Sequence, residues 1–85
     1  MKIIIVGCRK VGTALTAQLS HEDNLVTVID TDSIVVRNVS NTYDVMGIVG
    51  NGASYQVLQE ADIEHADLMI AVTKSDEMNL LCCVI

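Results

Sequence analysis

The amino-acid sequence predicts an α/β fold built on a parallel sheet, and three observations lead to that class. Short apolar runs recur along the 85 residues and alternate with stretches in which apolar positions follow a helical period. The connections between the runs are long enough for crossover helices, which parallel strands need. The first run leads directly into a loop that begins and ends with glycine. This combination is typical of a Rossmann-like fold, for which we expect the strand order 3-2-1-4.

Each expected strand is a short apolar run. The first consists mainly of Ile and Val, which is typical of a central parallel strand covered on both faces. We place the strands at residues 2–6, 25–29, 44–49 and 67–72. The sequence contains no linker, internal repeat or low-complexity segment. Residues 1–85 are therefore expected to form one partial Rossmann-type domain, cut short after the fourth strand and the start of the following helix.

Apolar periodicity and capping residues predict the helices. In the first helix, Val11, Leu15 and Leu19 form one apolar stripe. Side chains that cap helix N-termini precede the other three helices: Asp32, Ser54 and Ser75. Asp76 and Glu77 suit the positive N-terminal end of the last helix. The expected helices cover residues 11–21, 33–41, 54–61 and 75–85.

The composition limits the possible partners and the kind of core. Hydrophobic residues make up 51% of the chain, but it has no Trp, Phe or Pro, so we expect an aliphatic core. The net charge of −6 argues against nucleic acid or an anionic membrane as a partner, because both select basic surfaces. Three cysteines form no disulfide framework and fit a reducing cytosol. No apolar run reaches the ~20 residues of a membrane-spanning helix.

No pattern in the sequence indicates catalysis or a metal site. Cys82 and Cys83 are adjacent, and neighbouring positions on a helix point about 100° apart, so the two thiols cannot easily bind one ion. His21 and His65 are expected to be solvated. We therefore expect no catalytic residue and no bound metal.

The glycine-bounded loop is a candidate phosphate-binding site. In the motif G-x-G-x-x-G, the first glycine allows a tight turn after the strand, and the last lets the helix pack closely on the sheet. Gly7 and Gly12 hold those positions. Main-chain amides at the helix start would face the phosphates, and the helix dipole favours their negative charge. The candidate contacts in the loop are Gly7, Cys8, Arg9, Lys10, Val11 and Gly12.

Arg9 stands where this motif has its middle glycine. That glycine lets the backbone approach the pyrophosphate, so one interpretation is that the arginine side chain fills the phosphate space and weakens binding. In a second interpretation, the guanidinium swings outward and pairs with phosphate oxygens. A third is a solvated surface arginine on an adjusted loop. We favour weakened or altered dinucleotide binding over unimpaired binding.

Asp30 is the candidate ribose ligand. It lies 18 residues after Gly12 (30 minus 12), near the ~20 expected for the carboxylate that accepts hydrogen bonds from ribose hydroxyls. Its negative charge would repel a 2′-phosphate, which disfavours NADP. The alternative is a turn or cap residue before Asp32, but the glycine loop upstream favours the ribose role. Thr31 is a neighbouring candidate contact.

Two further segments follow strands at the edge where open α/β folds bind ligands. Asn51 and Gly52 come directly after the third strand and are candidate contacts for adenine or ribose. A plain turn stabilised by Asn and Gly is the alternative. Thr73 ends the fourth strand and is a candidate contact for the phosphate or the far half of a dinucleotide. Its alternative role is simply to lead into the next helix.

Several segments together resemble one family. They read Met-Lys-Ile-Ile-Ile-Val-Gly-Cys at residues 1–8, Val-Thr-Val-Ile-Asp at 26–30, Gly-Asn-Gly-Ala at 50–53, Ala-Asp-Leu-Met-Ile-Ala-Val-Thr at 66–73 and Ser-Asp-Glu-x-Asn at 75–79. Over essentially its whole length, the chain resembles the N-terminal part of a TrkA-type RCK (regulator of potassium conductance) or KTN domain. The segments at 50–53 and 71–79 are features of that family and not of Rossmann folds in general.

The resemblance implies a cytoplasmic regulatory subunit of a bacterial potassium uptake system, held at the inner face of the plasma membrane through its partner. Domains of this family bind NAD or NADH, ATP, ADP or AMP. They form homo-oligomers, as dimers or rings, beneath a Trk-type membrane potassium-translocating subunit, and nucleotide exchange gates the pore. By analogy, Gly7, Gly12, Asp30, Asn51 and Thr73 fall on nucleotide-contacting positions.

Two residues depart from the family pattern. Arg9 replaces a glycine, which puts the usual diphosphate pose in question. Asp62 replaces a glycine common after the third helix; if the backbone there is left-handed, Asp tolerates it at a cost of about 1 kcal/mol. Two other functions stay open: the cofactor-binding half of an NAD-dependent oxidoreductase, and an assembly module that has lost its ligand. The absence of a candidate acid or base favours the regulatory function.

Overall fold

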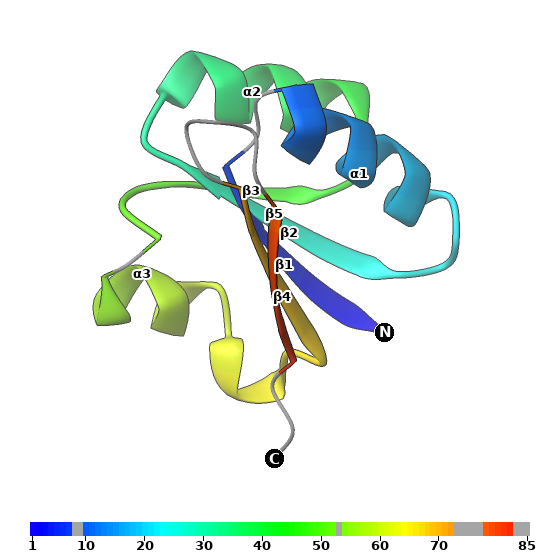
Figure 1. Cartoon of the computed structure of the whole chain (residues 1–85). Coiled ribbons are helices and arrows are strands. Elements are labelled where there is room, and N and C mark those ends of the chain that lie inside the picture. Colours follow the sequence, from blue (N-terminus) through cyan, green and yellow to red (C-terminus); the bar gives the residue numbers. More distant parts are fainter. Residues whose placement is uncertain (8–9, 53, 73–77, 83–85) are drawn as a thin grey trace.

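The α/β class is confirmed in the computed structural model (Figure 1). It describes residues 1–7, 10–52, 54–72 and 78–82, with only the main chain for residues 11 and 78–82. The strands within these residues are β1 Lys2–Val6, β2 Leu25–Asp30, β3 Met46–Val49, β4 Leu68–Val72 and β5 Met78–Cys82. They lie in the order β3-β2-β1-β4-β5, and the first four in this order are parallel. The expected order 3-2-1-4 is therefore confirmed.

Strand β1 lies at the centre of the parallel part of the sheet. Its Ile4 is opposite Thr27 of β2 on one side and Met69 of β4 on the other. Ile3, Ile4 and Ile5 are each exposed by 1% or less. Burial on both faces explains why this strand is a run of aliphatic residues and shows no apolar–polar alternation.

The helix expected over residues 75–85 is wrong for the part that the structure describes. Met78–Cys82 forms β5, which pairs antiparallel with β4 and places Met78 opposite Val72. The capping signal at Ser75 is local, whereas β4 would otherwise present unpaired amide and carbonyl groups along its outer edge. Strand pairing satisfies those groups, and such tertiary pairing overrides local propensity. Residues 73–77 and 83–85 lie outside the described part.

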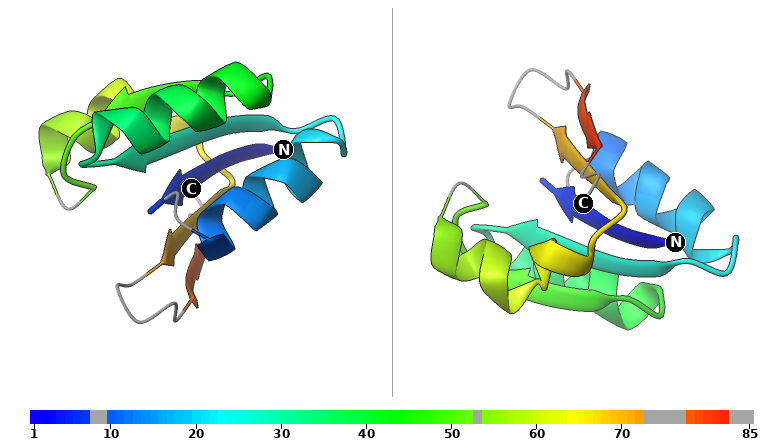
Figure 2. Two further views of the ribbon diagram at one scale, coloured as in Figure 1. Left: turned by 90° about the horizontal axis from the view of Figure 1, so that it is seen from above. Right: turned by 90° about the horizontal axis from the view of Figure 1, so that it is seen from below.

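Helices cover both faces of the sheet (Figure 1, Figure 2). Helix α1, Lys10–Ser20, and helix α2, Ser33–Thr42, lie on one face. Helix α3, Tyr55–Glu60, and the short 3₁₀ helix η1, Ile63–His65, lie on the other. The three α-helices are among those expected, with ends that differ by at most one residue. None of the helices in the described residues is long and apolar enough to cross a membrane.

The core is aliphatic on both faces, as the composition predicts. Ile3 and Ile5 pack toward α1 and α2, where Leu15 and Val39 meet them. Ile4 packs toward α3, together with Val57 and other aliphatic side chains. Alternate residues of one strand therefore anchor helices on opposite faces, as the period of a strand requires.

Asp32 and Ser54 behave differently as N-caps. The Asp32 carboxylate accepts a hydrogen bond from the main-chain N–H of Ile34, 3.0 Å away, so its predicted capping role is confirmed. Ser54 occupies the N-cap position of α3, but its side chain makes no capping hydrogen bond. Asp62 has φ 61° and ψ 49°, which confirms the left-handed backbone considered for that position.

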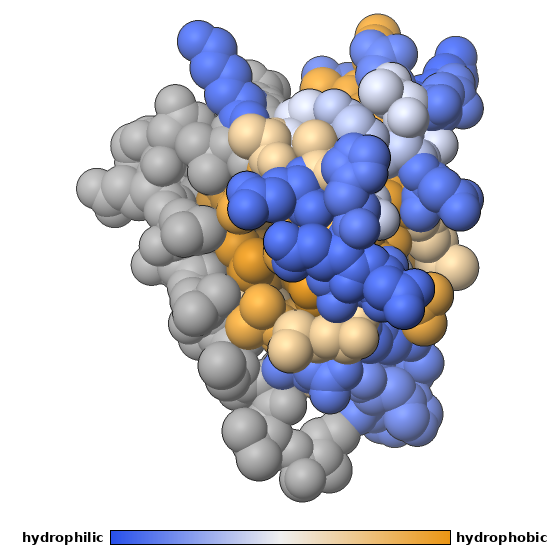
Figure 3. Space-filling model, turned by 90° about the vertical axis from the view of Figure 1, so that its right-hand side faces the viewer, coloured by the Kyte–Doolittle hydropathy of each residue, from blue (hydrophilic) through white to orange (hydrophobic). Residues whose placement is uncertain are grey.

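The side of the domain where α1 ends and β2 begins has a largely hydrophilic surface interrupted by hydrophobic patches (Figure 3). Leu25, the first residue of β2, is 73% exposed, and Met1 is 66% exposed. Leu25 begins β2 and Met1 directly precedes β1, and the Leu25 N–H donates to the Met1 carbonyl oxygen at 3.0 Å. A patch of two exposed apolar residues is ordinary on protein surfaces and needs no functional explanation.

Candidate functional site

The candidate site lies at the carboxyl edge of the parallel strands and begins with Gly7. Its φ is +94°, a backbone conformation that glycine adopts without strain. Its N–H donates a hydrogen bond to the carbonyl oxygen of Ile29 at 2.8 Å. A Cβ at this position would lie 2.8 Å from the carbonyl oxygen of Val72. Gly7 therefore sits where β1, β2 and β4 all end, and no larger residue fits there.

Gly12 packs against the main chain of that turn. A Cβ on Gly12 would overlap the Gly7 carbonyl oxygen, so α1 can pack this closely on the turn only because the side chain is missing. The buried Thr16 adds a hydrogen bond from its Oγ1 to the Gly12 carbonyl oxygen, 2.7 Å long. The close helix–strand approach predicted for the last glycine of the motif is thus present. It holds the first turn of α1 directly beside the end of β1.

The remaining loop candidates divide into described and undescribed residues. Lys10 is the first residue of α1 and is exposed. Val11 lies in the same helix, but its side chain is outside the described part. Cys8 and Arg9 lie outside the described residues as well.

Asp30 is the last residue of β2 and only 9% exposed. One oxygen of its carboxylate, Oδ1, accepts a hydrogen bond from the main-chain N–H of Asp32 at 2.9 Å. Asp30 therefore stabilises the turn before α2, as one alternative role predicted, whereas Asp32 is the N-cap of the helix. A carboxylate has two oxygens and about four acceptor sites, so the turn bond and a ribose contact are compatible. Thr31 lies between the two aspartates and is exposed.

The residues after β3 come close to both Asp30 and β1. The Gly50 N–H donates to the main-chain carbonyl oxygen of Asp30 at 2.9 Å. Two residues later, a Cβ on Gly52 would overlap the side chain of Val6, the last residue of β1. Residues 50–52 therefore run across the carboxyl edge from β3 toward β1.

Asn51 lies in this segment and is exposed. Its main-chain carbonyl oxygen accepts a hydrogen bond from the Ser54 N–H at 2.9 Å, which gives the turn that sequence spacing allows. That bond uses the main chain, so a contact between the Asn51 side chain and a ligand stays a separate proposal. Thr73 lies outside the described residues. Of the predicted residues that it describes, the structure therefore brings these to the carboxyl edge of the sheet: Gly7, Gly12, Asp30 and residues 50–52.

An open groove of about 610 Å³ lies elsewhere, between α1 and α2. Side chains of Lys10, Ala14, Val39 and Tyr43 are among its lining residues. The groove is on a helical face of the domain and not at the carboxyl edge. Sequence reasoning missed it, because no local pattern marks a space between two helices.

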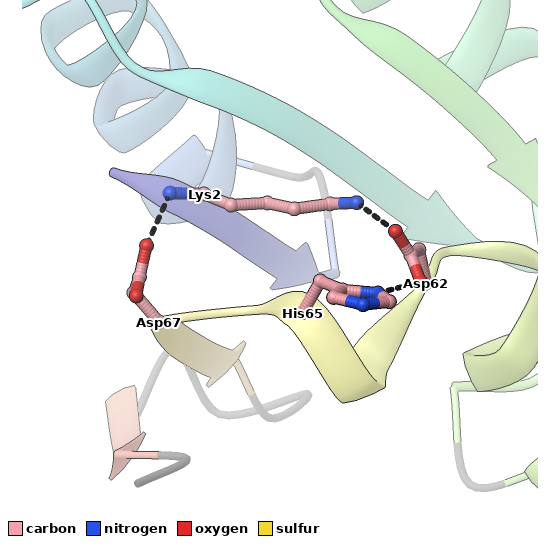
Figure 4. A network of polar contacts seen from close by, with 4 residues as sticks. All are labelled: Lys2, Asp62, His65 and Asp67. Atoms are coloured by element: carbon pink, nitrogen blue, oxygen red, sulfur yellow. Dashed lines mark hydrogen bonds and ion pairs between the residues drawn. The ribbon is translucent and has the colours of Figure 1, made fainter. Parts of the chain in front are cut away.

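A second polar cluster lies at the opposite, amino edge of the sheet (Figure 4). We call its four residues, Lys2, Asp62, His65 and Asp67, the amino-edge cluster. Lys2 Nζ lies 2.6 Å from Asp62 Oδ2, and His65 Nδ1 lies 2.7 Å from Asp62 Oδ1. The main-chain N–H of Lys2 donates to Asp67 Oδ2 at 2.8 Å. The hydrogen bonds from Lys2 and then from His65 lower the pKa of the Asp62 carboxyl below its usual value.

The amino-edge cluster joins the start of β1 to the connection between α3 and β4. It is distant from the candidate site, because the two lie at opposite ends of the same strands. His65, which the sequence predicts to be solvated, is largely exposed, although it also pairs with Asp62. Within the described residues, no three His, Cys, Asp or Glu side chains gather as a metal site would require.

The TrkA-N domain family matches this chain over residues 3–85. The chain belongs to the TrkA-N domain family. The match includes β1, the glycine turn, Asp30 and the segment after β3, which are the elements that build the carboxyl edge. The resemblance found from the sequence segments is therefore confirmed.

Named relatives of this TrkA-N domain are potassium uptake proteins. The Trk system potassium uptake protein TrkA of Halomonas elongata is 42% identical over 83 residues, which are 98% of this chain and 18% of the relative. The protein of the same name from Haemophilus influenzae shows the same identity and coverage. A TrkA homolog from Methanothermobacter thermautotrophicus is 35% identical over 85 residues, or 39% of its own length. The chain thus spans 18% of the length of the first two relatives.

Proposed function

We propose that this TrkA-N domain is a regulatory module that binds an adenine nucleotide and thereby controls a membrane protein that moves potassium. The observation that carries the proposal is the convergence of Gly7, Gly12 and Asp30 at one edge of the sheet. The names of the relatives support the link to potassium uptake. The module works by binding and carries out no reaction of its own.

The phosphates of the ligand bind at the start of α1. The close packing of Gly12 on Gly7 brings the first turn of the helix to the carboxyl edge, where main-chain amides at a helix start and the helix dipole favour an anion. Lys10 adds a positive charge to the same end of the helix. The diphosphate of NAD or NADH fits this end, and so do the phosphates of ATP, ADP or AMP.

The ribose binds at Asp30. Its carboxylate lies at the end of β2, one strand away from the phosphate end of the site. Two hydroxyls of a ribose can each donate to a carboxylate oxygen, and hydrogen bonds to a charged group are stronger than those to a neutral one. A 2′-phosphate would meet the charge of Asp30 and that of Asp32, so the site selects NAD over NADP.

Control of the partner follows from a shift of populations. If one nucleotide binds one arrangement of the assembled domains more tightly than another nucleotide does, exchange of the two shifts the assembly between arrangements. The partner is a Trk-type membrane potassium-translocating subunit, and the domain acts as a homo-oligomer at its cytoplasmic face. Potassium flux that ignores the bound nucleotide in the intact transport system would contradict this mechanism.

Calorimetric titration tests the binding step directly. The chain and its Arg9→Gly variant are each titrated with NAD, NADH, NADP, ADP, ATP and AMP. We expect micromolar affinity for at least one adenine nucleotide and at least tenfold weaker binding of NADP than of NAD. Binding only by Arg9→Gly would show that the arginine blocks the phosphates and would favour the assembly module. No binding by either form would contradict the proposal for this chain.

A further inference from the structure

We propose that two copies of this chain pair edge to edge through β3, in antiparallel orientation about a two-fold axis at Ile48. Within the described residues, β3 is the last strand on its side of the sheet and lies opposite the edge formed by β5 (Figure 2). The inference rests on the proposed function in one point, that the domain acts as a homo-oligomer, and it names the surface. Three observations lead to it: the direction of the main-chain groups, the placement of glycines, and the placement of charge.

The main-chain groups of Gly47 and Val49 point away from the sheet. The Gly50 N–H donates to the carbonyl oxygen of Asp30 in β2. Main-chain groups alternate in direction along a strand, so those of residue 48 also point toward β2, and those of residues 47 and 49 point outward. In the described part of the chain, no strand lies beyond β3 to pair with them. An edge strand of this kind is a template for pairing with another chain.

The hydrogen bonds on either side of β3 select the register of the pairing. The Val45 N–H already donates to the carbonyl oxygen two residues before it, and the Asn51 carbonyl oxygen already accepts a main-chain N–H of the following turn. Facing residues of a hydrogen-bonded antiparallel pair exchange both N–H···O bonds. Gly47 opposite Val49 of the second copy, and the reverse, therefore gives four bonds. The next register in either direction would need the main chain of Val45 or of Asn51.

On the side of α2, a large residue faces a glycine in this register. A Cβ on Gly47 would overlap the Val36 side chain of α2, so this face of β3 is flat at Gly47. Val49 lies on the same face, two positions later, and is 52% exposed. In the dimer it lies beside Gly47 of the second copy, which is itself exposed and presents no side chain. Each copy therefore supplies both the projecting residue and the space that receives it.

The same relation holds on the side of α3. Ile48 packs against the core of that face, and Met46, two positions earlier, is 60% exposed. In the dimer the two Ile48 side chains meet at the axis, and Met46 faces Gly50 of the second copy. Pairs of β-branched side chains on neighbouring strands stabilise a sheet. Because the fit on both faces comes from one sequence opposite itself, a second copy suits this edge, and a two-fold dimer is the commonest form of assembly.

The placement of charge is compatible with the pairing. Residues 45–51 are uncharged, although the chain has a net charge of −6. In the proposed register Asp44 faces residue 52 of the second copy, so the two Asp44 carboxylates lie about 26 Å apart, more than twice the ~10 Å over which 0.1 M salt screens charges. Edge strands that remain single are commonly protected by Lys or Pro, and β3 contains neither.

Sedimentation equilibrium of the ligand-free chain tests the dimer. The interface is small, so we expect a dissociation constant of about 10–300 μM. Val49→Pro removes an outward N–H, which an edge strand tolerates, and should weaken the dimer about 10- to 100-fold because two bonds are lost. Val49→Lys, which brings two like charges together, should weaken it by at least about tenfold. Leu25→Lys is the matched control, because Leu25 is exposed at the amino edge, and should stay within about twofold.

Cross-linking tests the register in a background with the three native cysteines changed to alanine. In Ile48→Cys, the two new residues face each other with Cα atoms about 4.5 Å apart, which allows a disulfide. In Met46→Cys, they lie about 13 Å apart along the strands, so oxidation should cross-link this variant at least about tenfold more slowly. Random collision would give the opposite order, because Met46 is the more exposed residue. Circular dichroism shows whether each variant is folded.

The outcomes separate this proposal from the proposed function. A parent chain that stays monomeric at about 1 mM would overturn the pairing. Equal weakening by Val49→Lys and Leu25→Lys, or faster cross-linking of Met46→Cys than of Ile48→Cys, would overturn it as well. If Val49→Pro does not fold, Val49→Lys decides. Nucleotide binding is measured apart, by calorimetry: binding by a monomeric chain contradicts only the pairing, and a dimer that binds no nucleotide contradicts only the proposed nucleotide site.

Discussion

The two ends of the parallel strands are built by different means. At the carboxyl edge, the geometry depends on missing side chains: Gly7 and Gly12 contact each other so closely that a Cβ does not fit. At the amino edge, Lys2, Asp62 and Asp67 join segments through charged groups. Steric exclusion fixes a shape whatever the pH or salt, whereas ion pairs at a surface are weak and respond to both. The edge that is proposed to bind ligand is the one with the rigid construction.

The largest effect on stability is expected from a substitution that disrupts the close packing of the two glycines at the carboxyl edge. In Gly12→Ala, the new methyl group collides with main-chain atoms of Gly7, which cannot move without disturbing the end of β1. We expect a loss of at least about 3 kcal/mol in the free energy of unfolding, enough to unfold much of a small domain. Urea denaturation followed by circular dichroism measures it. Gln18→Ala, a change in the same helix at a residue that is not buried, should stay within about 0.5 kcal/mol of the parent.

The second effect concerns ligand affinity and uses the two neighbouring aspartates. Asp30→Asn keeps an oxygen for the turn bond to Asp32 but removes the charge that is proposed to bind the ribose. We expect NAD or ADP affinity to fall by about 10- to 100-fold, which corresponds to roughly 1.5–3 kcal/mol for hydrogen bonds to a charged group. Calorimetry checks it. Asp32→Ala, which removes a charge two residues away, should leave this affinity within about threefold; an equal loss in both variants would contradict a specific ribose contact.

The third effect compares the two N-caps. Asp32 makes a capping hydrogen bond in α2, whereas Ser54 makes none in α3. Asp32→Ala should therefore lower the free energy of unfolding by about 1 kcal/mol. Ser54→Ala should leave it unchanged within about 0.5 kcal/mol. Urea denaturation measures both values. A loss of about 1 kcal/mol in Ser54→Ala as well would show that the Ser54 hydroxyl stabilises the fold in some way other than by capping α3.

Local patterns in the sequence are enough to predict most of the fold. The aliphatic run of β1 and the cap at Asp32 each act over a few residues, and the structure confirms both. The predicted helix at the end of the chain is wrong because β5 depends on pairing with β4, which no local signal reports. For the candidate site, glycine spacing and the position of Asp30 are enough to bring its main parts to one edge. The path of residues 50–52 toward β1 requires the structure.

The amino-edge cluster marks the limit of sequence reasoning most clearly. Lys2 and Asp62 are 60 positions apart, so nothing in the order of residues indicates that their side chains meet. Only the family pattern, in which a glycine is common at this position after the third helix, brings a left-handed backbone at Asp62 into consideration. The interpretation that this residue is a tolerated replacement for glycine gives no hint of its ion pairs. Asp62 thus combines a left-handed backbone with charged contacts to Lys2 and His65.

The smallest effect is therefore a pH-dependent one, at Asp62. Hydrogen bonds from Lys2 and His65 hold its folded-state pKa below the unfolded value of 3.8, so this carboxylate stabilises the fold above that pH. The contribution is lost as the pH falls through the folded-state pKa, because the protonated carboxyl no longer pairs with Lys2. Asp62→Asn should unfold at a lower urea concentration than the parent at pH 7, and the difference should shrink as the pH falls through the folded-state pKa of Asp62. Asn tolerates the left-handed backbone, so the comparison isolates the charge.

High salt should reduce the same difference at pH 7, since the pair is partly exposed and ions screen it. Lys2→Met removes one of the two partners of Asp62 and should reduce the stability difference between the aspartate and Asp62→Asn, leaving the contribution of His65. The stability difference between the parent and Asp62→Asn could persist unchanged at acidic pH or in the Lys2→Met background. That result would mean that the backbone conformation at residue 62, and not the ion pair, causes the difference. Nucleotide affinity should be the same in all of these variants, because the amino edge stabilises the strands without contacting the ligand.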